Sequence, residues 1–142
     1  MPPKMLRDDL HRFMKREFPQ TSEDYEVEKV VENGITVRMP VSDRNLRPGG
    51  TVSGPSIFGL ADIAFYLAIL AMIGPVALAV TTNCSIDFMR KPAAGRELIA
   101  KARILKLGKT LAVGDVLVYS EGESAPVARA GMTYSIPPKR PS

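Results

Sequence analysis

The sequence is poor in the residues that build metal sites, disulfides and nucleophilic centres. It has one cysteine, Cys84, and one histidine, His11. A lone cysteine excludes a disulfide within the chain, and one cysteine with one histidine is too few for a zinc-type site. The phosphate-loop motifs GxGxxG and GxxxxGK[ST] are also missing. Because these motifs are missing, we expect a protein that needs no cofactor. Because nothing indicates an oxidising compartment and the charged N-terminus lacks a signal-peptide core, we expect a cytoplasmic protein.

Charge is unevenly spread along a chain whose net charge is +4. Between Arg90 and Lys109 there are seven lysines and arginines and a single acid, Glu97. Such an excess of positive charge needs an anionic partner or good solvation. Nucleic acid, a phosphorylated cofactor and a solvated strand face all fit this pattern.

One long apolar run, over residues 57–80, carries a single charge, Asp62. Its helical part, 57–73, is at the short limit for crossing a bilayer, and Gly74-Pro75 ends the helix. A carboxylate in the middle of the run would be costly in lipid. We therefore expect a helix that is buried inside a protein, with no membrane as partner.

The rest of the chain predicts one further helix and six strands. Apolar residues at helical spacing predict a helix over 4–18, and Asn33-Gly34 marks the turn of a hairpin. Four strands follow the long helix, over about 80–88, 97–107, 110–119 and 126–136. In the last of them, alternation places Ala128, Ala130, Met132 and Tyr134 on one face. The order predicts a single α+β domain over residues 1–142, in which an antiparallel sheet wraps around one long central helix. The proline- and lysine-rich tail, 137–142, is expected to be disordered.

Two finer expectations follow from these patterns. In the strand 80–88, simple alternation places Cys84 and Ile86 on one face and Thr81 on the other. One sheet is expected to leave so apolar a helix partly uncovered, so a second subunit is the natural cover.

Asp62 is the outstanding candidate for chemistry, because it is the only charge between Arg47 and Asp87. A buried carboxylate must be paired, hydrogen-bonded or protonated, and such groups often serve catalysis. The alternative is a structural aspartate that caps a neighbouring chain or bonds a tyrosine.

The start of the same helix, Ser53-Gly54-Pro55-Ser56, is the second candidate. Its free N–H groups lie at a positive helix end, where they can stabilise negative charge on a substrate oxygen or simply be capped by Ser53 or Gly54. Asp62 lies roughly 12 Å further along the helix, so the two groups could meet one substrate only if they came from two chains.

Asn45 precedes Ser53-Gly54-Pro55, and Asp62 follows Ser53 by nine residues. This pattern resembles the PaaI-type hotdog acyl-CoA thioesterases, in which a loop asparagine precedes His-Gly-Gly and a carboxylate follows nine residues after the histidine. The strand 81–93 with its closing proline and the turn at Gly108-Lys109 extend the resemblance to about 25–136. Ser53 and Pro55 depart from the family motif.

The resemblance implies a hotdog fold and hydrolysis of an acyl-CoA thioester to a free acid and coenzyme A. Asp62 would act as base or nucleophile, and the N–H of Gly54 would polarise the thioester carbonyl. Asn45 would help to place substrate or water, and Thr81, or alternatively Thr82, of a neighbouring chain would hold the attacking water. The groups expected at the coenzyme A phosphates are Arg90, Lys91, Lys109 and Gly108.

The same resemblance implies a homo-oligomer, either a dimer or a dimer of dimers, and favours coenzyme A over nucleic acid as partner of the basic segment. Coenzyme A would be part of the substrate and not a cofactor. Because Ser53 and Pro55 replace motif residues, the alternative is a protein that binds acyl-CoA or fatty acid without turning it over.

Overall fold

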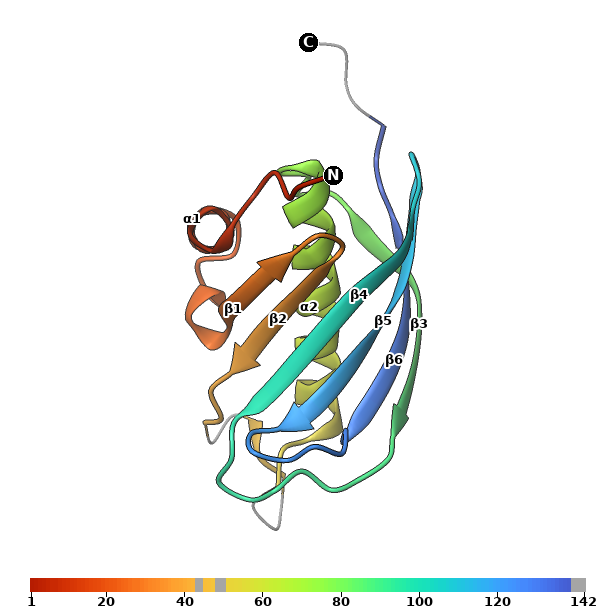
Figure 1. Ribbon diagram of the computed structural model, residues 1–142. Helices are drawn as coiled ribbons and strands as arrows, with labels where there is room; N and C mark the ends of the chain where they lie inside the picture. Colours follow the sequence, from red (N-terminus) through yellow and green to blue (C-terminus); the bar gives the residue numbers. More distant parts are fainter. Residues whose placement is uncertain (43–44, 48–50, 139–142) are drawn as a thin grey trace.

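The computed structural model describes residues 1–42, 45–47 and 51–138, and in it a six-stranded antiparallel sheet wraps around one long helix (Figure 1). The sheet has the strand order β1-β2-β4-β5-β6-β3. The elements are α1 (Arg7–Glu17), the 3-10 turn η1 (Ser22–Asp24), β1 (Glu26–Val31), β2 (Gly34–Met39), α2 (Gly54–Ile73), β3 (Val80–Phe88), β4 (Leu98–Leu107), β5 (Leu111–Ser120) and β6 (Ala128–Ser135). The predicted α+β fold class is confirmed.

The central helix α2 lies along the concave face of the sheet (Figure 1). Ser53 caps its start by accepting a hydrogen bond from the Ser56 N–H at 3.3 Å, and Gly74, with a φ of 96°, ends it. The helix is long and apolar enough to span a membrane, but 67% of its most apolar window is buried inside the protein. The chain's own sheet supplies much of this cover, and a second subunit as cover for the rest of α2 stays a prediction.

The edge strand β3 contains a bulge at its start. Thr81 pairs with Tyr134 and Asn83 pairs with Thr133, which leaves Thr82 as the extra residue. The bulge shifts the alternation by one, so Thr81 comes to the same inner face as Cys84 and bonds Asp62 there. The expectation that Thr81 and Cys84 lie on opposite faces is therefore wrong.

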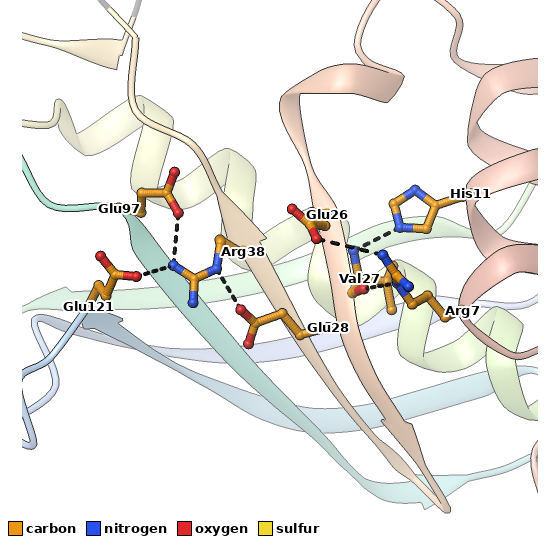
Figure 2. Close-up of polar contacts among 8 residues, drawn as sticks. All are labelled: Arg7, His11, Glu26, Val27, Glu28, Arg38, Glu97 and Glu121. Carbon is orange, nitrogen blue, oxygen red and sulfur yellow. Dashed lines mark hydrogen bonds and ion pairs between the residues drawn. The ribbon is translucent and has the colours of Figure 1, made fainter.

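Helix α1 covers the free edge of β1. Nε2 of His11 accepts a hydrogen bond from the Val27 N–H at 3.1 Å, and Nε of Arg7 donates to the Val27 carbonyl at 3.0 Å (Figure 2). Both backbone groups of an edge residue are thus satisfied by side chains of α1. The helix starts at Arg7 and not at Lys4, because the Lys4 N–H donates to the Ala71 carbonyl at the end of α2.

The β1–β2 hairpin turns one residue earlier than predicted. Val31 pairs with Gly34, so Glu32 and Asn33 form the turn, and Asn33 takes the left-handed conformation with a φ of 57°. The predicted tail and loop residues 139–142, 43–44 and 48–50 lie outside the described part of the chain.

An ion-pair network crosses the outer side of the sheet. Arg38 on β2 contacts three carboxylates, those of Glu28 on β1 and of Glu97 and Glu121 near the ends of β4 and β5 (Figure 2). These hydrogen bonds raise the pKa of Arg38 far above its usual value, with the bond to Glu97 contributing most. The network joins segments that are distant in the sequence.

Candidate functional site

Asp62 lies halfway along α2 and is held by two hydroxyl groups. Thr81 Oγ1 donates to Asp62 Oδ1 at 2.6 Å, and the Tyr134 hydroxyl lies 2.7 Å from the same oxygen. The three residues line a cavity of about 520 Å³, whose other wall includes Phe18 and Tyr25 from the segment after α1. A half-buried carboxylate with fixed orientation at the wall of a cavity is suited to act on a bound carbonyl compound.

The start of α2 forms a second group of site residues. The Ser53 side chain caps the Ser56 N–H, and Asn45 Nδ2 lies 3.4 Å from Ser56 Oγ, so Asn45 is held beside the helix end. Pro55 has no N–H, and the Gly54 N–H makes no hydrogen bond to any residue that the structure describes. This N–H remains available as a donor at the positive end of the helix.

Two of the predicted coenzyme A-binding residues lie next to this helix end. Gly54, Arg90 and Lys91 line one cavity of about 530 Å³, together with Arg47 and Phe88. Arg90 is itself anchored, since it donates to the Pro126 carbonyl at 2.8 Å. The cavity thus combines a free backbone donor with several positive charges, as an anionic ligand would require.

The other two predicted binding residues, Gly108 and Lys109, lie elsewhere in the chain. They form the turn between β4 and β5, at the end of the sheet opposite the start of α2 (Figure 1). The expectation that Arg90, Lys91 and Lys109 meet one ligand is therefore not met within a single chain.

Thr81 and Asp62 of the same chain are hydrogen-bonded to each other. That Thr81 of a neighbouring chain holds the attacking water stays a prediction. The bond to Tyr134 is the kind of contact that the structural alternative for Asp62 expects. The chemical role of Asp62 thus stays a prediction.

Tyr134 is the site residue that the sequence analysis missed. It was expected on one face of the last strand, and it lies on the inner face, but only the pairing of β3 with β6 shows that it faces Thr81.

The single cysteine, Cys84, and the single histidine, His11, do not form a second candidate catalytic site. Burial raises the pKa of the half-buried Cys84 thiol, and the Asp62 charge raises it further, so the thiol is poorly reactive. His11 is partly buried at the edge of β1, where its Nε2 accepts the Val27 N–H.

The sequence profile of the thioesterase superfamily matches residues 49–127, which is more than half of the chain. The chain belongs to the thioesterase superfamily. Acyl-coenzyme A thioesterase PaaI of Escherichia coli is 30% identical over 105 residues, covering 74% of this chain and 73% of that protein. The expected PaaI-type relationship is thereby confirmed, and membership identifies the chain as a thioester hydrolase.

Solved thioesterase structures share the whole fold. The crystal structure of a candidate thioesterase from Silicibacter sp. TM1040 is 54% identical, with a TM-score of 0.90 over 96% of this chain and 94% of that one. A hypothetical thioesterase from Streptococcus pneumoniae TIGR4, solved with coenzyme A, is 25% identical, with a TM-score of 0.73 over 94% and 98% of the two chains. The six-stranded sheet around α2 is therefore the hotdog fold of this superfamily.

Proposed function

We propose that the protein hydrolyses acyl-CoA thioesters to a free acid and coenzyme A. The observation that carries this proposal is the Asp62 carboxylate, which two hydroxyls orient at the wall of a cavity. Two relatives support coenzyme A as the thiol part of the thioester substrate. They are the protein from Streptococcus pneumoniae that was solved with coenzyme A and the acyl-CoA thioesterase from Escherichia coli.

In the proposed reaction, water supplies the oxygen of the new carboxylate. The C–S bond breaks, and the coenzyme A sulfur leaves as thiolate and takes up a proton. Asp62 either removes a proton from the water or attacks the carbonyl itself to form a transient anhydride, which water then opens. The Gly54 N–H would stabilise the negative charge that develops on the carbonyl oxygen.

This chemistry needs two copies of the chain. Asp62 is about 12 Å along the helix from Gly54, too far for both to touch one carbonyl in a single chain. We propose a homodimer in which the edge strand β3 pairs with its own copy. Among the described residues β3 has only β6 as a neighbouring strand, and Thr81 near its start and Phe88 at its end belong to the two separate cavities. Antiparallel pairing of two such strands would bring the Asp62 cavity of one chain toward the Gly54 cavity of the other.

The same dimer would give Lys109 a role. Arg90 and Lys91 would contact the coenzyme A phosphates beside Gly54, while Lys109 could reach the ligand only from another chain. Pairing of dimers into a tetramer is a further arrangement that the fold allows.

A non-catalytic acyl-CoA-binding protein is the second candidate. Ser53 and Pro55 stand where the family motif has histidine and its second glycine. In this alternative the two cavities would bind the ligand, and Asp62 would only tie α2 to β3 and β6.

The test is thiol release from short, medium, long and aromatic acyl-CoAs by the wild type, Asp62→Asn and Asp115→Asn. Asp115 is a matched control, because it pairs with Arg103 on the sheet, away from both cavities. We expect turnover that collapses only in Asp62→Asn. Saturable binding without turnover would favour the binding protein, and equal turnover by all three proteins would make Asp62 structural.

A further inference from the structure

Tyr134 places a hydroxyl group against Asp62 from the inner face of β6. Its side chain is only 3% exposed, and its hydroxyl lies 2.7 Å from Asp62 Oδ1 and 3.1 Å from the Asp62 carbonyl oxygen. A phenol has one proton to donate, and the carboxylate is both the closer and the charged acceptor. The hydrogen bond therefore goes to Oδ1.

The Tyr134 ring cannot easily move away from this position. It packs against Phe65 and Tyr66 of α2, with ring centroids 5.7 and 6.0 Å apart. Tyr66 is anchored in turn, because its hydroxyl donates to the Ala77 carbonyl at 3.1 Å. Burial raises the pKa of Tyr134 far above its usual value, and the neighbouring Asp62 raises it further. The hydroxyl thus remains a protonated donor throughout the neutral pH range.

Both donors bind the same oxygen of the carboxylate. Thr81 and Tyr134 donate to Oδ1, whereas Oδ2 receives no hydrogen bond from the described residues. Two fixed donors on one oxygen restrict rotation of the carboxyl group. The second oxygen is then the one left for a proton of water or for the thioester carbon.

We infer that Tyr134 is a positioning residue of the proposed hydrolysis, which holds the Asp62 carboxyl group oriented so that Oδ2 faces the substrate. This inference rests on the proposed function. The inference adds to the proposed function a residue that acts through Asp62 and does not itself touch the reacting atoms.

Tyr134→Phe removes the hydroxyl and keeps the ring. A hydrogen bond to a charged group is worth a factor of about 10 to 100 in rate, so we expect kcat to fall by that factor with KM changed less than about twofold. A fall in kcat with KM kept is expected when a reacting group loses its orientation while the substrate contacts remain. Tyr119→Phe is the control, since Tyr119 lies on β5 beneath Lys101 and outside both cavities.

A second readout does not require activity. Crystal structures should show one orientation of the Asp62 carboxyl group in the wild type and in Tyr119→Phe, and more than one in Tyr134→Phe. If Tyr134→Phe does not fold, replacement of Tyr134 by 3-fluorotyrosine keeps ring and hydroxyl while making a stronger donor, and kcat should then change with KM kept.

The outcomes separate the two claims. Normal kcat in Tyr134→Phe, with Asp62→Asn inactive, would overturn the positioning role and leave the thioesterase in place. If the wild type itself has no activity, the proposed function fails, and the crystal structures decide about Tyr134. An Asp62 carboxyl group with the same single orientation in Tyr134→Phe and in the wild type would then overturn the inference.

Discussion

The Thr81 hydroxyl on β3 donates a 2.6 Å hydrogen bond to Oδ1 of Asp62 on α2. This bond ties the edge strand of the sheet to the middle of the central helix. It exists because the bulge at Thr82 turns Thr81 inward, so the geometry of the candidate site depends on a local irregularity of an edge strand.

Removal of the Thr81 hydroxyl should therefore slow the reaction. Thr81→Val keeps the shape of the side chain but cannot donate, and we expect kcat for acyl-CoA hydrolysis to fall about 10-fold or more. Thr81→Ser keeps the donor and should stay within about threefold of the wild type, by the same scale. Steady-state thiol release measures both variants. An equal loss in the two would point to packing of the threonine methyl group, and no loss in Thr81→Val would make the contact irrelevant to rate.

The cavity at the start of α2 predicts a charge effect on substrate binding. Lys91→Gln removes an exposed positive charge near Gly54, so we expect KM for acyl-CoA to rise about two- to fivefold, and more at low salt than at high salt. A short thioester without the nucleotide should show no change. Lys15→Gln, which removes an exposed charge on α1, is the control. A rise in KM for both thioesters would contradict a role at the phosphates.

Lys109→Gln tests whether the ligand also reaches the opposite end of the sheet. A rise in KM similar to that of Lys91→Gln would mean that Lys109 contacts coenzyme A from a second chain. No change would restrict the phosphate contacts to the residues beside Gly54.

Much of the fold could be predicted because its signals are local. Gly54-Pro55 and Gly74-Pro75 fix the ends of α2, and the alternation of Ala128, Ala130, Met132 and Tyr134 gives the inner face of β6, on which all four are buried. The nine-residue spacing from Ser53 to Asp62 and the PaaI-type resemblance together pointed to the superfamily that the comparisons confirm.

The parts that could not be predicted depend on pairing between distant strands. Simple alternation puts Thr81 outward, and only its pairing with β6 reveals the bulge that turns it inward. Tyr134 was recognised as an inward residue, yet its contact with Asp62 needs the knowledge that β6 lies beside β3. In the same way, Arg90 and Lys109 belong to one basic segment of sequence but lie at opposite ends of the sheet.

The buried tyrosines predict a loss of stability at alkaline pH. Burial raises the pKa of Tyr66 from 10.0 to about 12, and burial raises that of Tyr134 further still. Above pH 10 the unfolded chain releases protons that the folded chain retains, so the free energy of unfolding should fall as pH rises, and below that pH these groups contribute no slope. Each tyrosine can contribute at most about 1.4 kcal/mol per pH unit.

Urea unfolding between pH 8 and 11 checks this expectation. Tyr134→Phe should lose less stability over the alkaline part of this range than the wild type, because one of the titrating groups is gone. Curves that stay parallel in the two proteins would show that the Tyr134 hydroxyl is not shielded as its surroundings imply.

Two glycines on neighbouring strands, Gly114 on the buried face of the sheet and Gly131 on its exposed face, should respond oppositely to alanine. A Cβ added at Gly114 on β5 would collide with the Arg103 carbonyl oxygen and lie 2.5 Å from Phe65 Cε1, whereas nothing lies within 4 Å of one added at Gly131 on β6. Gly114→Ala should therefore cost about 1–3 kcal/mol of unfolding free energy, and Gly131→Ala should be neutral or slightly stabilising. Since the displaced Phe65 ring packs on Tyr134, Gly114→Ala should also lower kcat. Thermal and urea denaturation of the two variants side by side provide the test, and equal stabilities would mean that the sheet yields at β5 without disturbing the ring that supports Tyr134.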